Sequence, residues 1–214
     1  MSAAAEEIIG LYRRHAQAWA QARGTRFPER HWFDRLAALL PRSAHVLDIG
    51  CGSGAPIALY LVKRGYTVTG VDGSPEMVGM FTANLPDQPA LVADMRQLDL
   101  GRTYDGLLAW DSFFHLAHDD QRAMFPRFAS HAGAGAPLMF TSGPAHGEAI
   151  GTLEGEKLYH ASLAPAEYVH LLDIHGFDVV SHVPDDPTCG GRTVWLARRR
   201  ERAVILPAQD CRRP

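Results

Sequence analysis

The sequence predicts an α/β protein built around a mostly parallel sheet, and three observations support that fold class. Short apolar runs alternate with stretches whose apolar residues recur every three or four positions over residues 45–176. Strands that alternate with helices form parallel sheets covered on both faces, which makes three layers. The length of 214 residues, with 46% hydrophobic and 21% charged residues, suits one such domain with a sizeable core.

The first residues, 1–44, predict a helical cap that precedes the sheet. Apolar and aromatic side chains recur there with helical spacing, which indicates one helix over about 5–23. A second amphipathic stretch over 29–40 stops at Pro41, which a helix does not easily pass.

From residue 45 onwards the predicted strands and helices alternate. Ser74 before Pro75 is typical of a helix start. A loop with two prolines and two glycines, 184–192, separates the last two strands, so we expect these to pair antiparallel. The predicted strands are HVLDIG (45–50), YTVTGVD (66–72), ALVAD (90–94), YDGLLAWD (104–111), PLMFTS (137–142), FDVVSHV (177–183) and TVWLARR (193–199), and the predicted helices cover 55–64, 75–84, 119–131 and 165–175.

These elements predict a main domain over 45–200 after the cap and a C-terminal tail over 201–214. Residues 143–162 are too long for an ordinary loop between a strand and a helix. They indicate either a lid over the active site or a surface hairpin with no substrate role. Six arginines from Arg198 onwards favour a solvated tail over a contact for an anionic partner.

The composition excludes several classes of protein. The 21 basic and 24 acidic residues give a net charge of −3, without the basic excess that binding to nucleic-acid phosphates uses. No apolar run reaches the roughly 18 residues of a membrane span, and Glu6 and Glu7 stand where a signal peptide would be basic. Cys51, Cys189 and Cys211 are too scattered for a disulfide framework or a zinc site. We expect a cytoplasmic monomer or homodimer that binds a small molecule, neither nucleic acid nor a membrane.

In open α/β sheets, ligands bind beyond the carboxyl ends of the strands. The first such strand end is followed by Gly50, Gly52 and Gly54, which let the backbone come close to a ligand. A predicted helix N-terminus, which favours a negatively charged group, comes directly after them. Asp72, which ends the second strand 22 residues after Gly50, is placed to accept hydrogen bonds from a ribose diol. By the same rule, the segments that are candidates for contact with a ligand are 48–54, 72–74, 94–95, 110–112 and 141–143.

Two nucleoside ligands compete for this loop. The spacing of Gly50, Gly52 and Ala55 also fits the G-x-G-x-x-A variant of dinucleotide-binding loops. Asp48 stands against that interpretation, because an anion there would oppose a pyrophosphate and suit an ammonium group. A ligand with an amino acid at one end and adenosine at the other, such as S-adenosylmethionine, fits better.

At this point the sequence resembles the class I S-adenosylmethionine-dependent methyltransferases of the small-molecule type. The resemblance rests on VLDIGCGSG (46–54), VTGVDGSPEMV (68–78), ALVADMRQLDL (90–100) and YDGLLAWDSFFHL (104–116), and it covers about 45–200. It implies a Rossmann-like three-layer sandwich in a methyltransferase domain. The sheet would have seven strands, mostly parallel, with the last inserted antiparallel next to the fifth.

The resemblance also implies which residues contact the cofactor. Asp48 would contact its amino-acid end, Asp72 its ribose hydroxyls and Asp94 its adenine amino group, while Trp110 would line the pocket. Trp19 and Arg23 of the cap are further candidates, with Arg23 placed to meet the methionine carboxylate, although simple packing and a solvated arginine are the alternatives. The full set of expected cofactor contacts is Trp19, Arg23, Asp48, Gly50, Cys51, Gly52, Asp72, Gly73, Ser74, Met77, Asp94, Met95 and Trp110.

Methyl transfer depends more on the alignment of a nucleophile with the methyl group than on acid–base catalysis. The catalytic residues are therefore poorly marked in the sequence. His115 follows the fourth strand and is a candidate general base. Its neighbour His118 lies three residues away, but no third ligand has metal-site spacing, so we expect no metal. The candidate substrate contacts are Tyr12, Phe114, His146, Tyr159 and His160.

The predicted function is therefore methyl transfer from S-adenosylmethionine to a small-molecule acceptor, with S-adenosylhomocysteine as product. The tetrapeptide Ala-Trp-Asp-Ser (109–112) differs from the Asn/Asp-Pro-Pro-Tyr type used on bases and amides. A module that binds S-adenosylmethionine without catalysis and an NAD-dependent oxidoreductase remain as alternatives.

Overall fold

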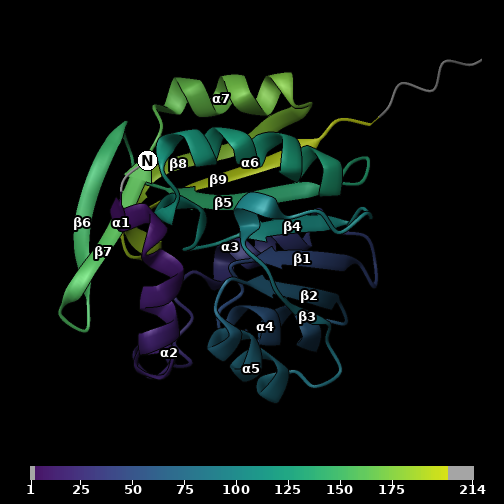
Figure 1. The fold of residues 1–214 in the computed structure, drawn as a ribbon. Helices are drawn as coiled ribbons and strands as arrows, with labels where there is room; N and C mark the ends of the chain where they lie inside the picture. Colours follow the sequence, from purple (N-terminus) through teal and green to yellow (C-terminus); the bar gives the residue numbers. More distant parts are fainter. Residues whose placement is uncertain (1–2, 202–214) are drawn as a thin grey trace, which may run out of the picture.

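The computed structural model describes residues 3–201, and these form a seven-stranded sheet between two layers of helices (Figure 1). The strand order is β3-β2-β1-β4-β5-β9-β8, which confirms the predicted α/β fold class. The main-sheet strands are β1 (His45–Ile49), β2 (Thr67–Asp72), β3 (Ala90–Val92), β4 (Gly106–Ala109), β5 (Pro137–Ser142), β8 (Phe177–Asp186) and β9 (Arg192–Arg199).

The first five strands pair in parallel, and the order of the sheet reverses beside β1. Val46 of β1 lies opposite Val68 of β2 on one side and Gly106 of β4 on the other. Strand β9 inserts antiparallel between β5 and β8, as expected. The reversal of strand order places a crevice at the carboxyl ends of β1 and β4, where ligands of such sheets bind.

The helices are α1 (Ala3–Glu6), α2 (Ile8–Arg23), α3 (Arg30–Ala37), α4 (Ile57–Lys63), α5 (Pro75–Asn84), α6 (His118–His131) and α7 (Pro165–Ile174), with short 3-10 turns η1 (Met95–Gln97), η2 (Phe113–His115) and η3 (Pro187–Cys189). Helices α6 and α7 cover one face of the sheet, whereas α4 and α5 lie on the opposite side (Figure 1). No helix of the described residues is both long and apolar enough to cross a membrane.

Two apolar cores follow from the alternation of side chains along the strands. Leu47 of β1 packs in a cluster with Phe113, Phe128 and Trp195 on the α6 and α7 side. Its neighbour Val46 belongs to a cluster on the other face, with residues from α3, α4 and α5. Both faces of the central strands are therefore buried, as in other parallel sheets.

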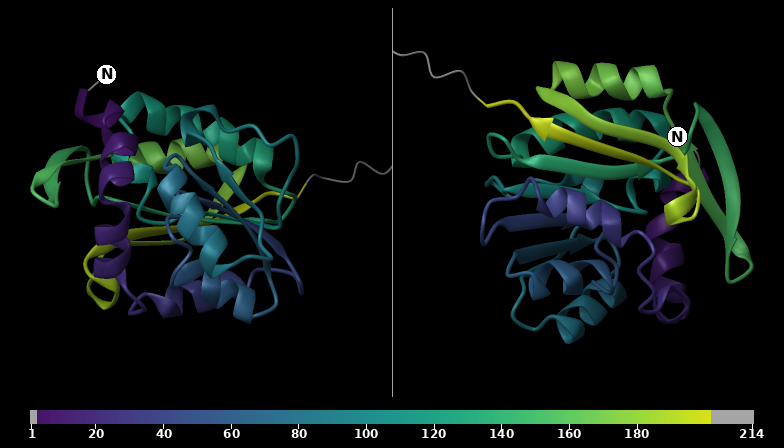
Figure 2. Two further views of the ribbon diagram at one scale, coloured as in Figure 1. Left: turned by 60° about the horizontal axis from the view of Figure 1, so that its bottom comes forward. Right: turned by 180° about the vertical axis from the view of Figure 1, so that it is seen from behind.

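The segment predicted over 143–162 is a two-stranded hairpin made of β6 (Gly147–Leu153) and β7 (Glu156–Ser162). The hairpin lies beside α2 at one end of the sheet, outside the main layers (Figure 2). Arg14 of α2 donates to Glu156 of β7 at 2.5 Å, and His15 contacts the same carboxylate at 2.6 Å. The backbone of His15 departs from helical geometry, so α2 is kinked at the residue that contacts the hairpin.

Several predicted element limits differ from the structure. The helix predicted over 5–23 is divided into α1 and α2, and β8 extends to Asp186, within the segment 184–192 that was predicted as a loop. The second cap helix ends at Ala37 rather than about residue 40, because the backbone N–H groups of Leu39 and Leu40 make turn-type bonds to Leu36 and Ala37. The helix predicted from 55 begins at Ile57, with Pro56 just before it. The tail predicted over 201–214 lies outside the described residues, apart from Glu201.

Candidate functional site

A cavity of about 990 Å³, including its open mouth, lies at the carboxyl ends of β1, β2 and β4 under α1 and α2. We call it the loop cavity, after the glycine loop that forms its floor. Most of the predicted contacts line it, namely Tyr12, Trp19, Arg23, Asp48, Gly50, Cys51, Gly52, Asp72, Gly73, Met77, Asp94, Met95, Trp110 and His115. The structure brings these residues together at one edge of the sheet, because the carboxyl ends of parallel strands meet there.

The glycine loop is pressed between the segment after β4 and the cap. A Cβ atom on Gly50, whose φ is +79°, would lie 2.2 Å from Cβ of Ser112. A Cβ atom on Gly52 would lie 3.1 Å from the ring of Trp19. The N–H groups of Gly50 and Cys51 both donate to the carbonyl of Val71, at 2.7 and 3.0 Å, and this anchors the loop to β2.

Asp72 connects the glycine loop to the turn before α5. Its carboxylate accepts hydrogen bonds from the N–H groups of Gly52 at 3.0 Å and Ser74 at 2.9 Å. Burial raises the pKa of Asp72, and these two hydrogen bonds oppose the rise. Ser74 itself is buried as the N-cap of α5 and accepts from the N–H of Met77 at 3.2 Å. Unlike Gly73 and Met77, Ser74 does not line the loop cavity, so the structure does not bring it together with the other predicted contacts.

Asp48 is a buried carboxylate without a compensating cation among the described residues. Burial, and then the negative charge of Asp72, raise the pKa of Asp48 to about 7. A positively charged group bound beside Asp48 would favour its ionised form. This end of the loop cavity therefore suits an ammonium group.

The third predicted acid, Asp94, is held by an arginine. Arg96 donates to both carboxylate oxygens of Asp94, with its Nη2 2.7 Å from Oδ2, and also to Glu6 of α1 at 2.9 Å. Burial would raise the pKa of Asp94, but the hydrogen bonds and charge of Arg96 lower it. The Asp94 carboxylate thus stays ionised and joins the cavity wall to the cap.

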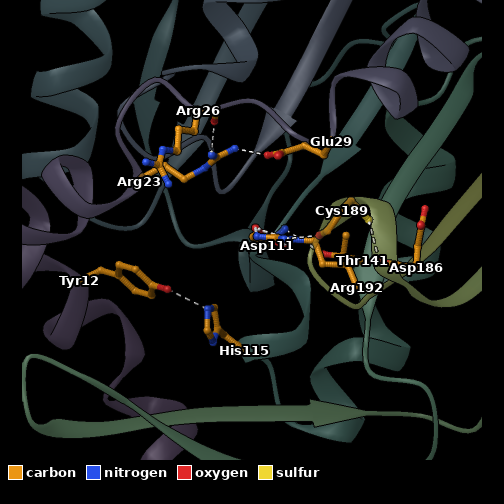
Figure 3. Close-up of polar contacts among 10 residues, drawn as sticks. All are labelled: Tyr12, Arg23, Arg26, Glu29, Asp111, His115, Thr141, Asp186, Cys189 and Arg192. Carbon is orange, nitrogen blue, oxygen red and sulfur yellow. Dashed lines mark hydrogen bonds and ion pairs between the residues drawn. The ribbon is translucent and has the colours of Figure 1, made fainter.

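Trp110 and Arg23, two further predicted contacts, also line the loop cavity. Trp110 is buried against Phe33 with ring centroids 5.0 Å apart, and no described residue accepts a hydrogen bond from its Nε1. Arg23 lines the cavity, but its guanidinium donates to the carbonyl of Arg26 at 2.8 Å and pairs with the buried Glu29 (Figure 3). Arg23 is therefore already neutralised within the protein.

Tyr12 and His115 both line the loop cavity, and their side chains point toward each other, apart from the Arg23 and Glu29 pair (Figure 3). Nδ1 of His115 lies 2.8 Å from the carbonyl of Tyr159, which can only accept, so Nδ1 carries the proton of the neutral ring. Nε2 then accepts from the hydroxyl of Tyr12 at 2.9 Å. Burial lowers the pKa of His115 to about 4, so the ring is neutral at pH 7. Burial first, and then the charges of Asp111 and Asp72, raise the pKa of Tyr12.

Asp111 adds an ion pair to this end of the cavity. It has a φ of +50°, which is uncommon outside glycine, and its N–H donates to Oγ1 of Thr141 at 2.9 Å. Its carboxylate accepts from Nε of Arg192 at 2.7 Å and from Nη2 at 2.7 Å (Figure 3). This pair fixes the start of β9 to the end of β4.

A second cavity, of about 780 Å³ with its open mouth, lies between the β6–β7 hairpin and the start of β9. We call it the hairpin cavity. The predicted substrate contacts Phe114 and His160 line it. Tyr159 lines neither cavity, because its ring is fully buried and its hydroxyl donates to Glu148 at 2.7 Å. His146 also lines neither cavity, and its ring stacks on that of His118 with centroids 4.5 Å apart, so the structure brings neither residue to a cavity.

Several residues that line the two cavities were not among the contacts that the sequence analysis predicted by name. Asp111 and Ser112 fall within the strand-end segment 110–112, so the sequence carried a signal for them. Arg192 carried none, because its place at the site depends on the pairing of β9 with β5. Among residues 3–201 there is no group of three or more His, Cys, Asp or Glu side chains that could hold a metal ion.

Comparisons with known proteins agree with this geometry. Residues 46–135 match the family model described as a methyltransferase domain. A dTDP-3-amino-3,6-dideoxy-alpha-D-glucopyranose N,N-dimethyltransferase from Streptomyces fradiae is 33% identical over 102 residues. That match spans 45% of this chain and 40% of the relative, so it covers less than half of either protein.

Solved structures share the fold over most of the chain. The amino pentose methyltransferase CalS10 from Micromonospora echinaspora, bound to S-adenosylmethionine, superposes with a TM-score of 0.67 at 20% identity. The match covers 86% of this chain and 95% of CalS10. Magnesium protoporphyrin IX methyltransferase from Synechocystis PCC 6803 gives a TM-score of 0.71 at 20% identity and covers 93% and 98%. The family match shows that residues 46–135 are similar to a methyltransferase domain, and the solved structures show that the described residues share the fold of methyltransferases that bind S-adenosylmethionine.

Proposed function

We propose that this protein transfers a methyl group from S-adenosylmethionine to an amine of a small-molecule acceptor. The observation that carries the proposal is Asp48, a buried carboxylate at the floor of the loop cavity that has no cation of its own. The methionine end of the cofactor bears an ammonium group, which would satisfy Asp48. The pyrophosphate of NAD would be repelled by the same charge, which disfavours an oxidoreductase.

The loop cavity fits the rest of the cofactor. Asp72 lies beside Gly52 and Gly73, where a ribose diol can donate to it. The side chains of Met77 and Met95 provide apolar walls for the adenine. When bound, the cofactor supplies a methyl group on a positively charged sulfonium sulfur. The sulfur loses that charge when the methyl group is transferred.

We assign the contact with the acceptor to Tyr12 and give His115 a positioning role. Because Nε2 of His115 already accepts from the Tyr12 hydroxyl, His115 reaches the cavity through Tyr12. This hydrogen bond directs the Tyr12 proton away from the acceptor and leaves oxygen lone pairs free to accept from an amine N–H. Tyr12 thus orients the nitrogen lone pair toward the methyl group, a contribution of alignment rather than of strong basicity.

The preference for an amine is supported by the relatives. The Streptomyces fradiae relative is named as an N,N-dimethyltransferase of an amino sugar, and CalS10 as an amino pentose methyltransferase. These names describe the relatives, but the residues proposed here to contact the acceptor also suit an amine. The oxygen of Tyr12 and the nearby charge of Asp111 both favour an N–H donor.

Calorimetry with S-adenosylmethionine, S-adenosylhomocysteine and NAD tests the proposal. We expect both sulfur ligands to bind, and Asp48→Asn to weaken S-adenosylmethionine binding at least tenfold, because the buried ammonium loses its counter-charge. Asp87→Asn, at an exposed site away from the cavity, is the matched control and should bind as the wild type does. Binding of NAD without heat from S-adenosylmethionine would overturn the proposal.

A further inference from the structure

Glu29 is a buried carboxylate between α2 and α3, and the structure of α3 does not account for it. Its side chain is only 1% exposed. It directly precedes Arg30, the first residue of α3, but its carboxylate accepts no hydrogen bond from the N-terminal backbone of that helix. The partner of the carboxylate is Arg23, the last residue of α2 (Figure 3). Because a buried carboxylate costs free energy unless it is paired, the burial of Glu29 depends on Arg23.

The guanidinium of Arg23 is held by two acceptors and keeps further N–H groups for a ligand. Its Nη1 donates to the carbonyl of Arg26 at 2.8 Å, and its Nη2 donates to Glu29. A guanidinium has five N–H groups, and no other described residue accepts from Arg23. Its Nε is not among the buried nitrogen atoms that lack a partner in the described residues, so it is open to solvent. Since Arg23 lines the loop cavity, a ligand there can reach these groups.

The amino-acid end of S-adenosylmethionine needs a partner for its carboxylate as well as Asp48 for its ammonium. Both groups are attached to the same carbon atom, so their two partners have to lie near each other. Asp48 follows Val46 by two positions along β1 and so faces the same side of the sheet, where Val46 packs with residues of α3. Glu29 directly precedes α3. The pair of Arg23 and Glu29 therefore lies on the same side of the sheet as Asp48.

Arg96 is the other cationic side chain that lines the loop cavity among the described residues. All three of its nitrogen atoms already donate to carboxylates. Nε and Nη2 donate to Asp94, and Nη1 donates to Glu6. Of the two arginines, Arg23 is thus the one with a nitrogen atom that no carboxylate occupies.

We propose that Glu29 is a positioning residue, which holds the guanidinium of Arg23 so that its remaining N–H groups bind the carboxylate at the methionine end of the cofactor. The zwitterionic end then lies between Arg23 and Asp48. Because Glu29 already balances the charge of Arg23, the carboxylate is recognised mainly through the geometry of its hydrogen bonds. This inference rests on the proposed function, since it takes the loop cavity as the cofactor site.

Calorimetry with two product-like ligands tests the inference without requiring turnover. S-Adenosylhomocysteine carries the amino-acid end, and 5′-methylthioadenosine lacks it. We expect Glu29→Ala to weaken S-adenosylhomocysteine binding about tenfold or more and to change 5′-methylthioadenosine binding less than about twofold. Glu29→Gln keeps an oxygen that accepts from Arg23, so it should bind S-adenosylhomocysteine within about threefold of the wild type. A merely structural role of Glu29 would weaken the binding of both ligands alike.

A double variant tests whether Glu29 acts through Arg23. Arg23→Gln should weaken S-adenosylhomocysteine binding about tenfold or more, and the added Glu29→Ala substitution should cause no further loss, because residues that act as one unit are not additive. Glu29→Asp, which withdraws the carboxylate by one methylene, should give a smaller loss confined to S-adenosylhomocysteine, and it replaces Glu29→Ala if that variant does not fold. Glu167→Ala is the matched control, because it removes a carboxylate paired with Arg122 away from both cavities.

The inference is overturned by wild-type affinity for S-adenosylhomocysteine in Arg23→Gln, or by equal losses for the two ligands in Glu29→Ala. It is also overturned by equal losses in Glu29→Ala and Glu29→Gln, or by a further loss in the double variant. A wild-type protein that binds neither S-adenosylmethionine nor S-adenosylhomocysteine would instead overturn the proposed function, and the inference with it.

Discussion

The two ends of the site are built in different ways. At the glycine-loop end, backbone N–H groups do most of the positioning, as in the bonds from Gly52 and Ser74 to Asp72. At the hairpin end, side chains far apart in the chain hold one another. Tyr12 and His115 are 103 positions apart, and Asp111 and Arg192 are 81 positions apart. Positioning by the backbone leaves the sequence little freedom to vary. Contacts between side chains can instead change the specificity of the site through single substitutions.

The largest effect of a single substitution is expected at the glycine loop. We expect Gly50→Ala to abolish detectable cofactor binding, a loss of at least 100-fold, and to cost about 3 kcal/mol or more of stability, because the new Cβ would collide with Ser112. Calorimetry and thermal unfolding measure both effects. Gly101→Ala, at φ +63° with nothing within 4 Å of the new Cβ, should cost only about 1 kcal/mol and leave affinity unchanged. Equal effects of the two substitutions would contradict the account of the loop.

At the hairpin end, Tyr12→Phe separates catalysis from cofactor binding. Removing the hydroxyl takes away the proposed contact with the acceptor, so we expect turnover to fall about 100-fold. The dissociation constant of S-adenosylhomocysteine should change by less than about threefold. Tyr66→Phe, which removes a hydroxyl bond to Ala37 away from both cavities, is the control. Wild-type turnover in Tyr12→Phe would remove Tyr12 from the mechanism.

The buried Asp48 predicts a pH dependence of stability opposite in sign to that of His115 at the hairpin end, whose pKa is lowered to about 4. The pKa of Asp48 is raised from the ordinary value of an aspartate to about 7, so between those two values the folded protein binds more protons than the unfolded chain. The Asp48 contribution therefore lowers stability as pH rises from about 4 to 7, by up to about 1.4 kcal/mol per pH unit, and levels off above pH 7. Chemical denaturation over this range, in wild type and Asp48→Asn, isolates the slope. Identical slopes would show that Asp48 does not titrate in this range.

Removal of the Arg192 charge tests the wall between the cavities. Arg192→Gln leaves Asp111 with an unpaired, partly buried charge, so we expect about a tenfold loss of kcat/KM for the acceptor with S-adenosylmethionine affinity largely kept. The double variant with Asp111→Asn should recover part of the loss, since the uncompensated charge is then gone. Strictly additive losses would indicate that the two side chains act independently.

The smallest effect is expected at the contact between α2 and the hairpin. Arg14 and Glu156 are exposed, and ion pairs at such positions contribute little. Arg14→Ala should shift Tm by no more than about 3 °C and leave cofactor affinity unchanged. A larger shift would indicate that the hairpin depends on α2 for its folding.

Much of the fold and of the cofactor end could be predicted, because both depend on local patterns. The strands showed as short apolar runs, and the cavity followed from the rule that strand ends meet at one edge. Ser74 was predicted as a contact from its position beside Asp72, and its hydroxyl caps α5 in the structure. His146 and Tyr159 were predicted as substrate contacts from the length of their segment, which does not reveal which face of a hairpin is buried.

The acid before the glycines, the acids at the ends of β2 and β3 and the alternation of strands with helices were all readable in the chain, because each is set by neighbours a few residues away. The partners of these groups were not. Arg96 lies two positions from Asp94, but the sequence did not show that their side chains pair. His115 meets Tyr12, and Arg192 pairs with Asp111, because strands and helices pack together across more than 80 positions of the chain. Charge and proton positions at the site follow from these long-range neighbours, since burial and pairing set the energy of every ionised group.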